Sequence, residues 1–195
     1  MGKMSEAVKE IGEKMKNFCL IRKDIDVQPF LAEIAHHEDF WSTERGRVIK
    51  VQRETLSFSL RSGVPEEGKI LWDCHGVINT QIYDLFPFTT SWLETFAEET
   101  GELSRVMIVN LRAEGKVYPH RDNGAYYRIR DRYHLVLQSV DGSRMISGDE
   151  EQVFRTGELW WFNNKEIHEA SNQSTSPRIH IIFDLLPKDK FHLAK

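Results

Sequence analysis

Short apolar segments separated by turn residues fill the second half of this chain, and they limit its possible folds more than any other feature. Residues 105–111, 133–140 and 178–186 are rich in β-branched and aliphatic side chains, as is typical of sheet strands. Shorter segments of the same kind, broken by glycine and asparagine, lie at 145–148, 152–157 and 159–164. Many short strands favour a β-sandwich or a double-stranded β-helix with helices packed outside.

Helical patterns are concentrated nearer the N-terminus. Apolar residues recur at three- and four-residue steps over residues 4–18, which predicts a first helix. Pro29 is expected to open a second helix that extends to Ala35, because proline at the first helical position loses no hydrogen bond. Ser91 and Glu94 form a capping-box pattern, so we expect a third helix to start there.

Two further local patterns predict β-structure. Residues 48–60 are rich in β-branched and apolar side chains and are expected to form a strand. Asp141-Gly142 follows the apolar segment 133–140 and indicates a tight hairpin turn. These patterns predict a mainly β fold with flanking α-helices.

The length and composition are those of an ordinary globular domain. We expect one domain over 1–195, with a helical N-terminal part over about 1–100 and a β core over about 105–187. The net charge of −4, without a basic block, argues against nucleic acid as a partner. No segment approaches the roughly 20 apolar residues of a membrane span, and the N-terminus lacks the apolar region of a signal peptide. We therefore expect a cytoplasmic protein with no membrane partner, whereas its oligomeric state is not indicated.

Three residues in the second half have the types and spacing of a metal site. Side chains two apart in a strand share a face, so His120 and Asp122 can point together, and His168 follows another predicted strand. Two imidazoles and one carboxylate form the facial triad of non-heme Fe(II) oxygenases, which leaves coordination positions open. A lone strand histidine is more often structural. The joint occurrence of these residues with Arg178 is what favours a metal site.

Two predicted strands carry polar side chains on a face that would otherwise be apolar. Arg178 and His180 alternate with aliphatic residues, and Arg132 and His134 repeat the pattern on another strand. A guanidinium on an inward face needs an anionic partner. A carboxylate is such a partner, because it binds arginine through charge-assisted hydrogen bonds. The pattern therefore fits a dicarboxylate cosubstrate such as 2-oxoglutarate.

The motifs around these residues resemble the aspartyl/asparaginyl β-hydroxylase family of Fe(II)/2-oxoglutarate dioxygenases. They occur in the family's order: PHRD at 119–122, R-x-H-L from Arg132, the turn that the family writes G-E-x-W-F and this chain GELWWF from Gly157, and S-x-x-P-R-x-H-x-x-x-D ending at Asp184. The resemblance covers about residues 105–187, whereas the first 100 residues match only loosely. It implies a double-stranded β-helix (jelly-roll, cupin-like) core.

The resemblance also implies a role for each singled-out residue. The implied Fe(II) ligands are His120, Asp122 and His168, and the implied contacts of 2-oxoglutarate are Arg178, Arg132 and His134. An enzyme of this kind uses dioxygen to convert 2-oxoglutarate to succinate and carbon dioxide while it hydroxylates a substrate C–H bond.

The resemblance limits the substrate less closely. The protein-hydroxylating animal members have glycine where this chain has Asp122, so the intact triad is more similar to the bacterial hydroxylases of free proline. We expect hydroxylation of an amino acid, free or peptidyl, with β-hydroxylation of Asp or Asn in a protein as the alternative. Arg121, Tyr126 and Arg128 follow the first histidine and are weak candidates for substrate contact; a solvated surface loop is the other interpretation.

Two other classes of protein stay open. One is a metal-dependent cupin enzyme that does not use 2-oxoglutarate, and the other is a non-catalytic binding module. Arg178 and Arg132 argue against the first, and the complete triad argues against the second. Asp73 and His75 form another pair of metal-ligand type, but no third ligand accompanies them in a matching pattern. We expect that segment to be a loop that lines the pocket.

Overall fold

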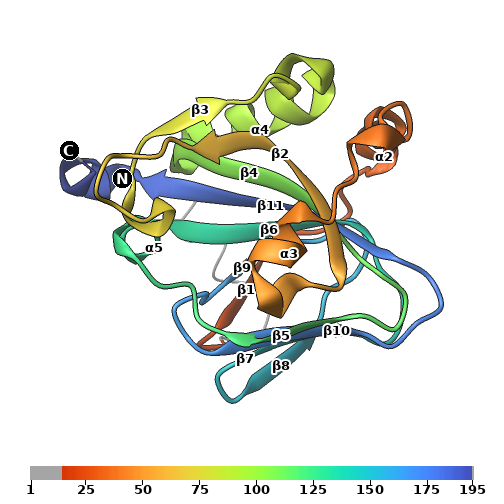
Figure 1. Ribbon diagram of the computed structural model, residues 1–195. Helices are drawn as coiled ribbons and strands as arrows, with labels where there is room; N and C mark the ends of the chain where they lie inside the picture. The colour runs from red at the N-terminus through yellow and green to blue at the C-terminus, as the bar shows by residue number, and fades with distance from the viewer. Residues whose placement is uncertain (1–14, 195) are drawn as a thin grey trace.

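Two antiparallel sheets form the framework of the protein (Figure 1). The structure is a computed structural model, and it describes residues 15–194. Over these residues the larger sheet has the strand order β1-β9-β6-β11-β4-β2-β3, and the smaller has the order β5-β10-β7-β8. The strands are β1 (Phe18–Arg22), β2 (Thr55–Gly63), β3 (Val77–Asn79), β4 (Gly101–Leu111), β5 (Lys116–His120), β6 (Asp131–Gln138), β7 (Ser143–Ser147), β8 (Glu150–Val153), β9 (Leu159–Phe162), β10 (His168–Asn172) and β11 (Arg178–Pro187).

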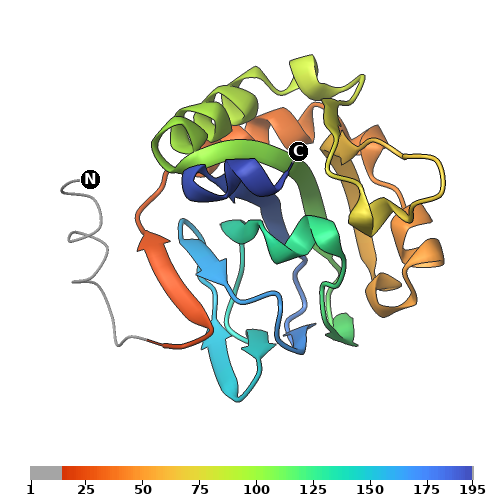
Figure 2. The same ribbon diagram turned by 90° about the vertical axis from the view of Figure 1, so that its left-hand side faces the viewer.

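Helices cover the outer face of the larger sheet. α4 (Pro87–Thr100) packs against β4 and β11, and α2 (Gln28–Ala35) packs against α4. Figure 2 shows these two helices on one side of the sheet and β7 and β8 on the opposite side. The shorter α3 (Glu44–Val48) lies beside β2, and α5 (Ala125–Arg128) lies beside the 3₁₀ helix Leu71–Asp73. The other 3₁₀ helices are Glu38–Phe40, Lys50–Gln52, Tyr83–Leu85 and Lys188–Leu193.

Alternation along the central strand β11 divides the core into two layers. Ile181 and Phe183 belong to the apolar cluster between sheet and helices, where Phe183 meets Phe96 edge-on at 5.8 Å. Arg178 and His180 instead line a cavity between the two sheets. This arrangement confirms the predicted alternation and the predicted mainly β, double-stranded β-helix (jelly-roll) fold.

Several predicted elements are present. The helix expected from Pro29 to Ala35 is α2, and the strands expected at 105–111, 133–140 and 178–186 are parts of β4, β6 and β11. The helix expected from Ser91 also exists, but it begins at Pro87. Its first turn is capped from a distance, because Glu33 accepts hydrogen bonds from the backbone N–H groups of Phe88 and Thr89 at 2.6 and 3.0 Å. Ser91 is therefore an interior residue, and the local capping-box pattern misplaced the start.

Other local predictions are wrong in part. Most of the helix expected over 4–18 lies outside the described residues, and its last residue, Phe18, begins β1. The strand expected over 48–60 starts only at Thr55, because α3 and a 3₁₀ helix occupy the preceding residues. Asp141-Gly142 does not close a hairpin, because β6 and β7 belong to different sheets. The turn instead carries the chain from one sheet to the other.

In the described part of the chain, no helix combines the length and apolar character needed to cross a membrane.

Candidate active site

Three side chains of metal-ligating type meet at the ends of β5 and β10. His120 is the last residue of β5, His168 is the first of β10, and the two are partners in the antiparallel ladder. Their ring centroids lie 4.2 Å apart. Within residues 15–194, His120, Asp122 and His168 form the one group of three potential ligands, with their ligand atoms all within 4.8 Å of one another. Strand pairing therefore brings the two histidines together, and the turn after β5 places Asp122 beside them.

Both imidazoles are held with Nε2 available. His120 Nδ1 lies 2.8 Å from the carbonyl oxygen of Tyr118, and His168 Nδ1 lies 3.0 Å from that of Glu166. A carbonyl oxygen only accepts hydrogen bonds, so each Nδ1 carries the proton and each Nε2 keeps its lone pair. Burial lowers the pKa of His168 to about 4, so this imidazole is neutral at neutral pH. That is the protonation state that binds a metal.

The carboxylate of Asp122 has one restrained oxygen and one that faces the imidazoles. Oδ2 accepts hydrogen bonds from Arg132 Nη1 at 2.7 Å and from Asn164 Nδ2 at 3.0 Å. Oδ1 lies 3.9 Å from His120 Nε2. Burial, the largest influence, would raise the pKa of Asp122, but the guanidinium of Arg132 together with smaller contributions such as the Asn164 hydrogen bond outweighs it, and the pKa lies below its ordinary value. The group is therefore charged and oriented before any metal binds.

Arg132 is itself restrained by a second buried carboxylate. Its Nε and Nη2 donate to Oδ1 and Oδ2 of Asp184 at 2.7 and 2.9 Å, and the Tyr126 hydroxyl donates to Oδ2 at 3.1 Å. Sequence reasoning assigned Arg132 to the cosubstrate and gave Asp184 no role. In the structure Arg132 bridges Asp184 and Asp122 and also lines the cavity. A cosubstrate role for Arg132 stays a prediction.

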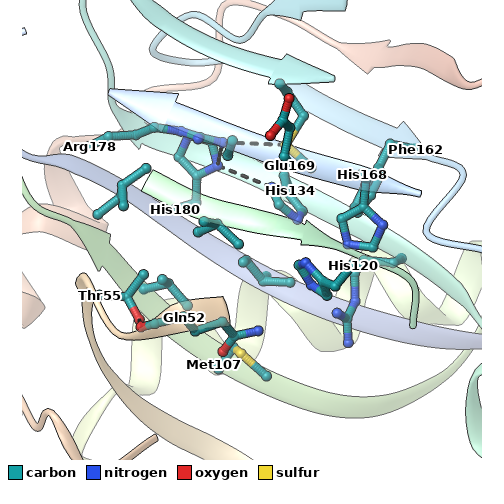
Figure 3. A pocket seen from close by; sticks show the side chains of 17 residues that line it. Gln52, Thr55, Met107, His120, His134, Phe162, His168, Glu169, Arg178 and His180 are labelled. Carbon is teal, nitrogen blue, oxygen red and sulfur yellow. Dashed lines mark hydrogen bonds between the residues drawn. The ribbon is translucent and has the colours of Figure 1, made fainter. Parts of the chain in front are cut away.

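Arg178 lies at the opposite end of the same cavity. Figure 3 shows Arg178 and His180 at one end, His120 and His168 at the other, and His134 between them. Arg178 Nε donates to His180 Nε2 at 2.9 Å, and the Nδ1 atoms of His180 and His134 are 3.2 Å apart. Because His180 Nε2 accepts from Arg178, the neutral ring carries its proton on Nδ1, which lies 3.2 Å from His134 Nδ1 and 3.3 Å from Arg178 Nη2. A guanidinium nitrogen cannot accept a hydrogen bond, so His134 is the acceptor. The His134 ring then has its own proton on Nε2, where it is a hydrogen-bond donor.

Arg178 is a buried cation without a carboxylate partner. The residue is 5% exposed, and among the described residues no carboxylate forms an ion pair with it. Burial lowers its pKa to about 10. Burial, and after it the charge of Arg178, lowers the pKa of His134 and of His180 well below the ordinary value. Both imidazoles are therefore neutral, and this end of the cavity is suited to an anion.

The three residues proposed for substrate contact lie in different surroundings. Arg121 lines a second cavity beside the triad, whereas Arg128 is exposed on α5. Tyr126 is fully buried and lines neither cavity, with the guanidinium carbons of Arg105 and Arg130 at 3.7 and 4.1 Å from its ring centroid. Its position is that of a supporting core residue.

Asp73 and His75 are used within the protein rather than gathered into a second metal site. Asp73 Oδ1 accepts a hydrogen bond from the backbone N–H of Ala125 at 2.7 Å. His75 Nδ1 lies 3.0 Å from Arg130 Nη1. In the described part of the chain no third ligand joins this pair. The expectation of a loop lining the pocket is correct only for the neighbouring Trp72, which lines the second cavity.

Sequence reasoning missed four residues that contact the site. Asn164 and Asp184 restrain Asp122 directly or through Arg132, and Gln52 lines both cavities. Arg45 lies in the second cavity. Asp184 ends a motif that was visible in the sequence, whereas nothing in the sequence around Arg45 or Gln52 indicates a site.

A jelly-roll fold that gathers two histidines and an aspartate in this way carries the donor set of the non-heme Fe(II) oxygenases. The chain belongs to the aspartyl/asparaginyl β-hydroxylase family, whose model matches residues 33–187. The match starts well upstream of the motif-bearing segment, so it also includes most of the N-terminal part that resembled the family only loosely.

Individual relatives are more distant. The chain is 25% identical over 126 residues to L-proline cis-4-hydroxylase of Rhizobium meliloti (strain 1021), a match that covers 64% of this chain and 44% of that protein. The match therefore spans less than half the length of that relative.

Two solved structures share the fold at low sequence identity. An oxidoreductase of the 2OG-Fe(II) oxygenase family from Burkholderia pseudomallei has a TM-score of 0.61 at 13% identity, covering 94% of this chain and 89% of that chain. A prolyl hydroxylase from Trichoplax adhaerens, in complex with a hypoxia inducible factor oxygen degradation domain peptide fragment, has a TM-score of 0.59 at 13% identity, covering 93% and 88%. At this identity the two likenesses establish the fold alone.

Proposed function

We propose that this protein is an Fe(II)- and 2-oxoglutarate-dependent dioxygenase that hydroxylates an amino acid, either free or within a peptide. The observation that carries the proposal is the buried guanidinium of Arg178, which no described carboxylate pairs with, across one cavity from His120 and His168, the two imidazoles grouped with Asp122. A metal at one end and an anion at the other would use both ends of that cavity. Membership of the family supports the same reaction class.

The donor set fits Fe(II). Two imidazole nitrogens and one carboxylate oxygen leave room on the metal for a chelating oxoacid and dioxygen. Bound iron and 2-oxoglutarate would supply the oxidation that places a hydroxyl group on a substrate carbon. The protein would contribute binding, orientation and charge.

Each polar residue of the cavity has a corresponding role in the proposal. Arg178 would bind the distal carboxylate of 2-oxoglutarate, and His180 restrains that guanidinium through its 2.9 Å hydrogen bond. His134 would donate its Nε2 proton to a cosubstrate oxygen. Arg132 would keep Asp122 charged and oriented. The hydrogen bond between Arg132 and Asp184 holds the guanidinium in that position. Apolar side chains such as Leu111 and Phe162 line the walls between these groups and limit the entry of water.

L-Proline is the first substrate to test. The curated relative is named for proline hydroxylation. The resemblance in sequence, with Asp122 completing the triad, also favours the bacterial hydroxylases of free proline. The second candidate is an Asp or Asn residue in a peptide, which the family's description favours.

The proposal is tested by adding Fe(II) and 2-oxoglutarate to the pure protein without oxygen and recording the visible spectrum. We expect a weak charge-transfer band that is absent from His168→Ala and present in His192→Ala, in which the exposed His192 is removed. Oxygen should then produce succinate faster in the presence of the correct amino acid or peptide. A wild-type protein that binds neither iron nor 2-oxoglutarate would exclude the proposal and favour a non-catalytic binding module.

Arg178 separates this proposal from a cupin enzyme that does not use 2-oxoglutarate. Arg178→Gln removes the cation that would pair with the distal carboxylate, so we expect the dissociation constant of 2-oxoglutarate to rise about 30-fold or more. The matched control is Arg144→Gln, because Arg144 is an exposed arginine that pairs with Glu151 at 2.6 Å. Unchanged activity and affinity in Arg178→Gln would favour the cupin alternative.

A further inference from the structure

A second cavity adjoins the first beside the triad. His120 and Gln52 line both cavities, and Asp122 lines the second. Much of the remaining wall comes from α3 and the 3₁₀ helix that follows it, including Arg45. A molecule in this cavity would lie next to the triad and leave the space in front of Arg178 free.

The charged groups of this cavity favour an anionic ligand. Asp122 is the one carboxylate among the residues that line it, and Arg132 already neutralises that group. Arg121 is exposed and lies 3.7 Å from Glu166. Arg45, in contrast, forms no ion pair with any described residue. Arg45 is therefore the cation of this cavity whose guanidinium is available to pair with the carboxylate of a ligand.

The Arg45 guanidinium is also oriented. Its Nε donates to Oε1 of Gln52 at 2.7 Å, and the Gln52 side chain lines both cavities. The residue is half-buried, and burial lowers the pKa of its guanidinium. The two Nη groups are not used in any hydrogen bond to a described residue. A guanidinium with one edge restrained and the rest available is prepared for a planar oxyanion.

The other walls are suited to an apolar body. Ile49, Val51, Trp72 and Tyr127 line the same cavity, and Tyr127 is buried. Aliphatic and aromatic surfaces of this kind bind a hydrocarbon ring or chain by burial of apolar area. The C–H bonds of such a ligand would face the triad.

We propose that Arg45 binds the carboxylate of the substrate, and that the substrate is a small free amino acid with an apolar side chain. This inference rests on the proposed function, because it places the substrate beside the metal ligands. The carboxylate could in principle come from the α-carboxylate of a free amino acid or from an aspartate side chain of a peptide. The apolar side chains beside Arg45 favour the free amino acid, because its own apolar side chain would cover them while its carboxylate meets the guanidinium.

The test compares ligands that differ only in the carboxylate. L-Proline with L-prolinamide and L-leucine with L-leucinamide are two acid–amide pairs, and a capped peptide with an internal Asp is compared with its Asn counterpart. Dissociation constants are measured without oxygen, both on the metal-free protein and after loading with Fe(II) and 2-oxoglutarate. We expect at least one free acid to bind about 30-fold or more tightly than its amide.

Variants at one helix assign that preference to Arg45. Arg45→Gln should reduce the preference for the acid to less than about 3-fold and leave the affinity of the amide unchanged. Arg45→Lys keeps the positive charge and should recover part of the preference. Arg47→Gln is the matched control, because Arg47 is an exposed arginine on the same short helix.

The outcomes separate this inference from the proposed function. An acid preference that survives in Arg45→Gln, or its absence from the wild-type protein, would overturn the assignment of Arg45. A preference seen only for the Asp peptide would overturn the free amino acid as the substrate. A normal Fe(II)–2-oxoglutarate band in Arg45→Gln, with substrate binding lost, supports both proposals. An acid preference in a protein that forms no such band would contradict the proposed function alone.

Discussion

At the scale of single residues, the candidate site depends on a chain of buried charges. Asp184 holds Arg132, and Arg132 together with Asn164 holds one oxygen of Asp122, so the other oxygen faces His120. Partners of this kind orient metal ligands without touching the metal. The burial of one cation between two carboxylates also makes each member costly to remove.

Replacement of Asp184 tests this arrangement. Asp184→Asn leaves Arg132 with one carboxylate, so we expect a loss of about 3 kcal/mol in the free energy of unfolding. We also expect about 10- to 100-fold weaker binding of Fe(II), because Asp122 is less well oriented. Denaturant unfolding and metal titration measure the two effects.

Asp131→Asn is the matched control for this change. Asp131 begins the strand that carries Arg132 but is partly exposed, with Lys165 and Lys190 at 3.6 and 3.9 Å. Such pairs contribute at most about 1 kcal/mol. Equal effects of the two substitutions would contradict a special role for Asp184.

At the scale of elements, the turn between β5 and α5 positions the first two residues of the triad. Gly124 ends this turn with φ +118°, and a Cβ there would lie 2.3 Å from the carbonyl oxygen of Trp72. That close approach packs the turn onto the 3₁₀ helix that supplies Trp72 to the second cavity. Glycine is needed here both for the backbone conformation and for space.

Substitution of Gly124 separates these two requirements. Gly124→Ala should lower the free energy of unfolding by about 3 kcal/mol, because strain and overlap with backbone atoms act together. Gly68→Ala should cost only about 1 kcal/mol, because Gly68 has φ +74° but nothing within 4 Å of an added Cβ. Similar losses for both variants, measured by denaturant unfolding, would show that the contact with Trp72 is unimportant.

At the scale of the whole molecule, the two sheets enclose imidazoles that stay neutral. His134 and His180 are 4% and 3% exposed, and burial followed by the nearby Arg178 lowers the pKa of each well below its ordinary value. In the unfolded chain their pKa values return to about 6.5. Below that pH the unfolded state binds more protons than the folded state, so acid favours unfolding.

The free energy of unfolding of the metal-free protein should therefore decrease as the pH is lowered. The stabilising contribution of the two imidazoles is fully present above pH 6.5 and decreases as the pH falls towards their folded-state values. Each of these two histidines accounts for roughly 2 kcal/mol at pH 5, and His168, whose pKa burial lowers to about 4, adds a similar amount, so we expect a loss of about 6 kcal/mol between pH 7 and 5. Urea unfolding at several pH values measures it. His180→Gln should reduce the slope by about one proton and the exposed His36→Gln should not; a flat profile would contradict neutral buried imidazoles.

The sequence by itself determined the residue types of the triad, the alternation along β11 and the strand-rich second half, because these depend on local periodicity and on spacing within one strand. The metal-binding and cosubstrate roles of those residues stay predictions. Tertiary structure decided what distant segments do to one another. It joined Asp184 to Asp122 through Arg132, capped α4 with Glu33, placed Arg45 beside the triad, and sent the chain at Asp141-Gly142 into a second sheet. These outcomes depend on which surfaces are buried together, and burial is a property of the folded chain that no local pattern contains.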